Sequence, residues 1–286
     1  MILPIYKITR MVPIKIGITG KRRDLPLKLI KTVFPLKGHL LNLPDGITID
    51  TNIENEKLLF YYFHNLVRYY QKSPLFSYIR ANLSGNDIFL DIGANLGFYS
   101  YLAKKICRCQ VFLFEPEPGH LEFLKRNQHL FEKIYDVALS DKAGETDFYV
   151  GDGKNPGGSS LVMSAAGWEA SGYSHTIKIR TQRLDKMELD PDLIRKIRLI
   201  KIDVEGAEKS VVTGMEGLLK EHTFDIWCEV RGDDSDRNPG SYRDICHYLE
   251  QFEYQPMIYD GKKLKTFNEG HVKQVFDILF RKKTRV

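Results

Sequence analysis

The stretch Ile88-Phe89-Leu90-Asp91-Ile92-Gly93-Ala94-Asn95-Leu96-Gly97 decides the fold of this chain. Its first residues are apolar and end on an acid, which predicts a buried strand over 88–91. Two glycines follow and predict a tight turn that opens a helix over 97–105. The turn lacks the complete Gly-x-Gly-x-x-Gly series that cradles a pyrophosphate, so a dinucleotide ligand is disfavoured.

The same rhythm of strand and helix continues outward from this turn. Strands that alternate with helices predict a doubly wound, mostly parallel, seven-stranded α/β sheet of Rossmann-like type with right-handed crossovers. The last two strands are joined without a helix, which predicts an antiparallel edge strand. We expect strands over 88–91, 111–115, 134–139, 197–203, 225–229, 254–259 and 275–280, and helices over 97–105, 119–131, 207–220 and 242–251.

Residues 140–185 interrupt this rhythm. They hold strand-like segments at 146–150 and 177–181 around a Gly/Ser-rich loop, 155–160, which we interpret as a substrate loop, with a surface turn as the alternative. Residues 1–84 form a predicted N-terminal cap, and residues 85–286 form the main domain. In the cap we expect a hairpin over 43–49 with Asp45-Gly46 at its turn, a helix over 55–70, and a helix from Ser73-Pro74 to Asn82.

Composition narrows the class of protein. The 286 residues are 43% hydrophobic and carry 42 basic against 37 acidic side chains, which excludes disordered and collagen-like chains. The basic residues gather near the ends rather than in a stripe, so we expect no nucleic-acid partner; solvated termini are favoured over weak contact with an anionic membrane surface. No apolar run reaches 18 residues, which predicts no transmembrane helix. Four cysteines without metal-site spacing fit reduced thiols in a cytoplasmic protein, and the oligomeric state stays open.

Four predicted strands end on an acid: Asp91, Glu115, Asp203 and Glu229. Each alone could cap a helix, but the carboxyl ends of parallel strands share one edge, so the four should converge on a ligand crevice. Buried carboxylates need partners, and a cationic sulfonium ligand would be one. Glu115 follows Gly93 by 22 positions, the spacing of an acid that binds ribose hydroxyls.

Several segments resemble, in content and order, the FkbM family of methyltransferases. The resemblance covers residues 85–280, and its most specific part is Lys201-Ile-Asp-Val-Glu-Gly-Ala-Glu208. It implies a doubly wound methyltransferase fold, S-adenosylmethionine as donor, and O-methylation of a hydroxyl on a sugar, a glycan or a secondary metabolite. The other matching segments are Asp91–Ser100, Phe114–Pro116, Leu124–Asn127, Val137–Ser140 and Gly158–Leu161.

Carried onto this chain, the resemblance implies a role for each matching residue. The methionine end of the donor would be held by Asp91, Gly93 and Asn95, and the ribose by Glu115. Asp136 and Ala138 would border the adenine, and Asp203 would lie at the methyl-transfer point. The full set of expected donor-binding residues is Asp91, Gly93, Ala94, Asn95, Gly97, Glu115, Pro116, Asp136, Ala138 and Asp203.

An alcohol is a poor nucleophile, so a general base should assist the transfer. The candidates are Asp203, Glu205, Glu229 and His175, and Asp203 is favoured by its place at a strand end. Crowded like charges could raise the pKa of one of these acids, which suits a base. Alternatively, some of these carboxylates bind a divalent cation.

Structural alternatives accompany these roles. Glu205 could cap the helix that follows it, Glu208 could pair with Lys201 or Lys209, and His175 could be a surface residue. Arg231 either binds an acidic group of the acceptor or neutralises Glu229. For the whole protein, the competing hypotheses are a nucleotide-dependent oxidoreductase, a non-catalytic ligand-binding member of the fold, and an RNA methyltransferase.

Overall fold

The computed structural model describes residues 40–42, 48–50, 73–151, 158–162, 173–232 and 241–283. The chain divides into two compact units, Met1–Arg68 and Tyr69–Val286. In the first unit, β1 (Leu40–Asn42) pairs antiparallel with β2 (Thr48–Asp50), with Leu41 opposite Ile49. These strands flank the predicted Asp45-Gly46 turn, which lies outside the described residues, as does the predicted helix 55–70. The proposed boundary at residues 84 and 85 stays a prediction.

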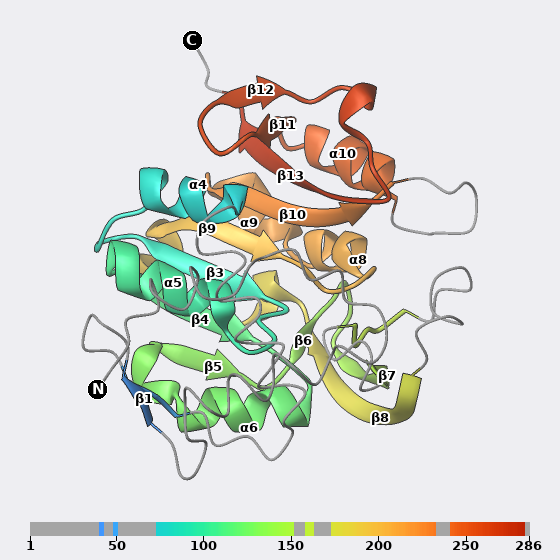
Figure 1. Ribbon diagram of the computed structural model, residues 1–286. Coiled ribbons are helices and arrows are strands. Elements are labelled where there is room, and N and C mark those ends of the chain that lie inside the picture. The colour runs from blue at the N-terminus through green and yellow to red at the C-terminus, as the bar shows by residue number, and fades with distance from the viewer. Residues whose placement is uncertain are drawn as a thin grey trace, which may run out of the picture. The chain divides into compact units, whose positions relative to one another are not determined.

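The second unit is built on a sheet of eight strands (Figure 1). Five strands run parallel, and β13 lies antiparallel between β10 and β11. The short strand β12 adds an antiparallel edge beside β11. The predicted doubly wound sheet is thus confirmed, with β12 added to the seven strands expected. In spatial order the strands are β5 (Lys133–Tyr135), β4 (Gln110–Phe114), β3 (Ile88–Ile92), β9 (Ile197–Ile202), β10 (Asp225–Arg231), β13 (Val275–Lys282), β11 (Tyr254–Tyr259) and β12 (Leu264–Thr266).

Helices cover both faces of this sheet because successive strand residues point to opposite sides. On one face, α4 (Pro74–Asn82), α5 (Phe98–Cys107) and α6 (Pro118–Arg126) pack on Phe89, Leu113 and Leu199. Ser73 caps α4 as predicted, since its hydroxyl accepts a hydrogen bond from the backbone N–H of Phe76.

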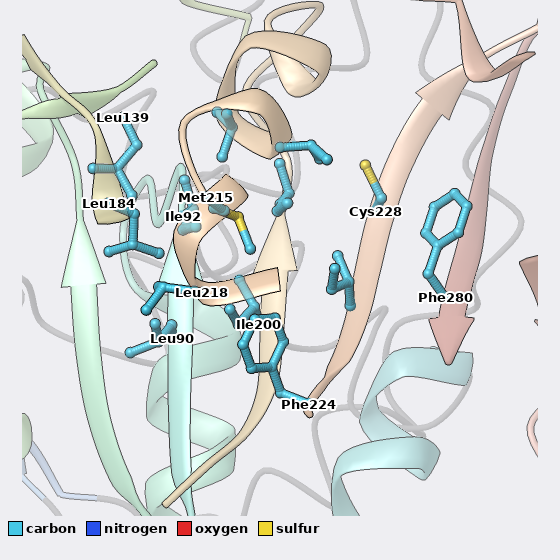
Figure 2. Close-up of a cluster of buried hydrophobic side chains, with 14 of the residues drawn as sticks. Leu90, Ile92, Leu139, Leu184, Ile200, Met215, Leu218, Phe224, Cys228 and Phe280 are labelled. Carbon is cyan, nitrogen blue, oxygen red and sulfur yellow. The ribbon is translucent and has the colours of Figure 1, made fainter. Parts of the chain in front are cut away.

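The opposite face carries the larger apolar cluster, shown in Figure 2. There Leu90, Ile92 and Ile200 meet Met215 and Leu218, and all five are at most 7% exposed. The helices on this side are α8 (Glu208–Thr213), α9 (Glu216–Glu221) and α10 (Tyr242–Glu250), with the short α7 (Pro191–Arg195) leading into β9.

Two elements differ from the sequence prediction. The expected helix 207–220 is broken into α8 and α9 at Gly214, where a Cβ would lie 2.1 Å from the carbonyl oxygen of Ser140. The expected strand 134–139 is divided into β5 and β6 (Ala138–Leu139), because the chain leaves the main sheet at Asp136 and joins another. That second sheet has the order β6-β8-β7, with β7 at Gly144–Gly151 and β8 at Tyr173–Gln182, which confirms the strand-like segments predicted there.

The described ranges contain no helix that combines the length and the apolar character needed to cross a bilayer.

Candidate active site

Strand register places six residues in one row at the carboxyl edge of the parallel strands. Ile92 pairs with Phe114 on one side and with Ile202 on the other, and Ile202 pairs with Cys228. Phe114 also pairs with Tyr135, and the row lies one residue beyond these partners. It runs across the sheet as Asp136, Glu115, Gly93, Asp203, Glu229 and Asp277, the last because Asp277 pairs with Glu229.

The glycine loop, residues 91–97, joins β3 to α5 through three residues with left-handed backbone. Gly93, Asn95 and Gly97 have φ angles of +72°, +53° and +70°. At Gly93 a Cβ would lie 1.9 Å from the carbonyl oxygen of Asp203. Only glycine therefore lets the loop lie against the end of β9.

Asp91 is 1% exposed, and its two carboxylate oxygens have different partners. Ser100 at the start of α5 donates a hydrogen bond to Oδ2 at 2.7 Å. The Nζ of Lys201 lies 3.2 Å from Oδ1 as an ion pair. Burial raises the pKa of Asp91, while Lys201 and Ser100 oppose that rise. The carboxylate therefore holds the loop to the neighbouring helix and strand.

Glu115 follows β4 and is 4% exposed. Its Oε2 accepts a hydrogen bond from the backbone N–H of Asn95 at 2.7 Å, and its Oε1 accepts one from the N–H of Glu117 at 2.9 Å. The buried His120 places Nδ1 3.4 Å from Oε1 of Glu115 and 3.3 Å from Oε2 of Glu117. Burial raises the pKa of Glu117, and His120 opposes that rise.

Asn95 carries the most informative polar atom of the loop. Its side-chain oxygen Oδ1 is buried, yet it has no hydrogen-bond partner among the described residues. A buried acceptor without a donor costs free energy unless a ligand supplies one. The loop thus offers an acceptor to an N–H group that the described residues do not supply.

The carboxylate cluster comprises Asp203, Glu205 and Glu229, whose oxygens can approach within 4.8 Å of one another. The charge of Asp203, followed by burial, raises the pKa of Glu229 to about 9. Burial and the charge of Asp203 raise the pKa of Glu205 to about 7, although Arg231 donates to its Oε2 at 2.7 Å. Burial, with a contribution from Asp203, raises the pKa of the adjacent Asp277 to about 6. Glu229 therefore carries a proton at neutral pH.

The loop from β9 to α8 resolves two of the alternatives left by the sequence. Glu205 has a φ of +57° and does not cap α8, whose N-cap residue is Ala207 and lacks a side-chain capping bond. Glu208 pairs with neither Lys201 nor Lys209: its Oε1 accepts hydrogen bonds from the N–H groups of Val204 at 3.1 Å and Gly206 at 3.0 Å. Arg231 pairs with Glu205 rather than with Glu229.

Three other predicted site residues lie apart from the carboxylate cluster. His175 is an exposed residue of β8, with Nδ1 2.8 Å from the hydroxyl of Ser174. The Asp136 side chain is 48% exposed and pairs with Lys125, whereas Ala138 is buried in β6. The roles expected of these residues stay predictions.

Ser159 and Ser160, from the end of the Gly/Ser-rich loop, fasten the second sheet to the site. The hydroxyl of Ser159 donates to Oε2 of Glu117 at 2.6 Å. The hydroxyl of the fully buried Ser160 donates to the carbonyl of Glu205 at 2.8 Å. Residues 155–157 of the predicted substrate loop lie outside the described residues. Beyond Gly206, a cavity of about 390 Å³ opens between α8 and α10.

The sequence reasoning missed three residues with a place in this site: Lys201, His120 and Asp277. Lys201 opens the segment that most resembles the family, but the only contact considered for it was with Glu208. Its position two residues before Asp203, on the same face of the strand, was the available signal. Asp277 interrupts the apolar strand 275–280 and could have been recognised as a buried acid from that alone.

Comparison with known proteins places the chain in a family. The family model of the methyltransferase FkbM domain matches residues 91–256, more than half of the chain. The methyltransferase sdnD of Sordaria araneosa is 28% identical over 195 residues, which cover 57% of this chain and 75% of that protein. The 2-O-methyltransferase NoeI of Sinorhizobium fredii is 27% identical over 185 residues, covering 58% and 72%. The crystal structure of methyltransferase FkbM from Methylobacillus flagellatus gives a TM-score of 0.44 at 11% identity; the alignment covers 91% of this chain and 59% of that one.

Proposed function

The chain belongs to the methyltransferase FkbM family, and we propose that it transfers a methyl group from S-adenosylmethionine to a hydroxyl of a sugar, a glycan or a secondary metabolite. The observation that carries this proposal is the single row of Glu115, Gly93, Asp203 and Glu229 at one sheet edge. That row brings the glycine loop within reach of a group of acids, which is the arrangement a cationic nucleoside donor requires.

The residues present fit such a donor. The orphan acceptor Oδ1 of Asn95 suits the ammonium of a methionine moiety, and the acids of the row suit a sulfonium. We assign the methionine end to Asp91, Gly93, Ala94, Asn95 and Gly97. We assign the ribose to Glu115 and Pro116, and the adenine border to Asp136 and Ala138. When bound, S-adenosylmethionine would supply an already activated methyl group.

The chain's own contribution is to orient the acceptor and take up its proton. Asp203 is the preferred base because it lies in the centre of the row and its side chain is 28% exposed at the open edge. Glu229, with its pKa raised to about 9 chiefly by Asp203, carries a proton at neutral pH and can donate a hydrogen bond. Glu205 and His175 are the remaining candidates for the base.

We propose that the reaction needs no divalent cation, because the Arg231 guanidinium already provides a positive charge at Glu205. The spacing of the three carboxylates would nevertheless admit a shared ion. Turnover that survives exhaustive treatment with a chelator is the expected result. Loss of turnover that Mg²⁺ or Mn²⁺ restores would assign the cluster to a metal instead.

The acceptor class is supported by a relative. NoeI is a 2-O-methyltransferase by name, so its methyl acceptor is an oxygen. We further propose a cytoplasmic location, because the cysteines Cys107, Cys109, Cys228 and Cys246 are free thiols.

Two measurements test the proposal. Calorimetry should show binding of S-adenosylmethionine and S-adenosylhomocysteine but not of NAD, whereas tight NAD binding alone would favour the oxidoreductase. Mass spectrometry should then compare glycans and metabolites of cells with and without the protein. A compound that differs by one added CH₂ identifies the acceptor. Donor binding without any such product would favour a non-catalytic member of the fold.

A further inference from the structure

Lys201 is a buried lysine two residues before Asp203, which belongs to the row at the sheet edge. It lies in β9 directly beside Asp91 of β3, and it is 4% exposed. An ammonium has three N–H donors, and three oxygens surround this one. Oδ1 of Asp91 and Oδ2 of Asp203 each lie 3.2 Å from Nζ, and the carbonyl oxygen of Gly93 lies 3.3 Å away.

The group is charged in this setting. Burial by itself lowers the pKa of Lys201, but the carboxylates of Asp203 and Asp91 raise the pKa by more. Its Nζ also lies 5.5 Å from the centroid of the Tyr99 ring, which is a favourable position for a cation. The ammonium thus lies between two carboxyl groups, those of Asp91 and Asp203.

The three oxygens belong to two different parts of the site. Asp91 and the carbonyl of Gly93 are in the glycine loop, whereas Asp203 is in the carboxylate cluster. We propose that Lys201 is a positioning residue whose single ammonium fixes the glycine loop and the Asp203 carboxylate relative to one another. This inference rests on the proposed function, because it concerns how donor and acceptor sides of that site are aligned (Figure 1 shows β3 and β9 side by side).

Fold stability and donor binding have to be separated in any test of Lys201. On the same sheet face, Leu199 and Trp227 are apolar and at most 2% exposed, whereas Asp91 across from Lys201 in β3 is a buried acid. Removal of the lysine alone leaves the Asp91 carboxylate buried without its cationic partner, which costs stability. A positioning role therefore predicts a loss of donor affinity in variants that still fold.

The test compares donor affinity with fold stability in three variants of the full chain. Lys201→Met removes the charge and all three donors, and Lys201→Arg keeps the charge. Lys282→Met is the matched control, because Lys282 holds the backbone carbonyls of Leu219 and His222, both at 2.8 Å. Thermal unfolding is recorded first, and the affinity for S-adenosylhomocysteine is then measured by calorimetry at a temperature where each variant is folded.

We expect folded Lys201→Met to bind the probe at least about tenfold more weakly than wild type, with partial recovery in Lys201→Arg. Lys282→Met should lower Tm without changing the affinity. An affinity of folded Lys201→Met within about threefold of wild type would overturn the proposal.

If Lys201→Met does not fold, Lys201→Gln decides, because glutamine removes the positive charge but stays polar. An affinity of folded Lys201→Gln within about threefold of wild type would overturn the proposal, whereas binding weakened about tenfold or more would support it. Failure of the wild-type chain to bind either S-adenosyl compound is a different result, because it contradicts the proposed function.

Discussion

The acids of the glycine-loop half and those of the carboxylate cluster have different kinds of partner. In the glycine-loop half, Asp91 accepts a hydrogen bond from Ser100 and forms an ion pair with Lys201, and Glu115 accepts hydrogen bonds from two backbone N–H groups. In the carboxylate cluster, Asp203, Glu205 and Glu229 crowd together, and Lys201 and Arg231 offset only part of their charge. The partners of the glycine-loop half therefore hold it in a fixed shape, whereas the carboxylate cluster is suited to bind and release protons.

The largest effect should come from the base. Asp203→Asn keeps the shape of the side chain but removes its basicity, so turnover should fall by about 10²- to 10⁴-fold. Donor affinity should stay within about threefold of wild type, because the glycine loop is untouched. Single-turnover kinetics and calorimetry measure the two quantities, with the exposed Asp147→Asn as control. Near-normal turnover with the true acceptor would remove Asp203 as the base.

The next largest effect should be on donor binding by the glycine-loop half. Asp91→Ala removes the partner of both Ser100 and Lys201, and Glu115→Ala removes the acceptor of the Asn95 N–H. Each should weaken donor binding by roughly 100-fold or more, since a buried charged partner is lost. Calorimetry checks this against the exposed Glu145→Ala. Unchanged affinity in either variant would contradict the assignment of the loop as the donor site.

Backbone shape gives a smaller but sharper test. Gly93→Ala places a Cβ 1.9 Å from the carbonyl oxygen of Asp203 at a φ of +72°, so we expect about 3 kcal/mol of destabilisation or more. Gly261→Ala is the matched control, because its φ of +92° is also left-handed but nothing lies within 4 Å of the new Cβ. Its cost should be only about 1–2 kcal/mol. Denaturant unfolding measures the loss of unfolding free energy in each variant. Equal losses in Gly93→Ala and Gly261→Ala would show that the backbone near Asp203 shifts readily to accommodate the new Cβ.

The smallest expected effect is on the pH dependence of Tm, which follows from the raised pKa of Glu229. The pKa of Glu229 is raised from 4.5 to about 9 by Asp203 and by burial, so the folded chain holds a proton that the unfolded chain has lost. The stabilising contribution is complete below about pH 4.5 and disappears as the pH rises through about 9. Glu229→Gln should therefore flatten the fall of Tm with pH and raise Tm by roughly 5 °C near about pH 8.5.

Part of that fall with pH should remain in Glu229→Gln, because the pKa values of Glu205 and Asp277 are also raised, chiefly by burial. An identical dependence of Tm on pH in wild type and Glu229→Gln would contradict the raised pKa. Asp225→Asn is not a suitable control, since Asp225 accepts from Tyr78 and Arg281.

The sequence predicted the row because strand ends can be read locally. Apolar runs that close on Asp203 and Glu229 need only the rule that parallel strands share an edge. Contacts between distant segments could not be read in this way. Lys201 reaches the carbonyl of Gly93 across 108 positions, and the break of the helix at Gly214 depends on the backbone of Ser140 lying against it. The prediction of one continuous strand through Asp136 was wrong, because Tyr135 pairs within the main sheet whereas Ala138 pairs within the second sheet.

The place of β13 has a consequence for synthesis of the chain on the ribosome. Of the described strands it emerges last, yet it enters between β10 and β11 rather than joining an outer edge. Until then β10 has an open side, and Trp227 and Cys228 lie beside unpaired backbone groups. The nascent sheet is therefore incomplete until its final strand arrives, and a chaperone that shields β10 during translation would act at the most aggregation-prone moment of its folding.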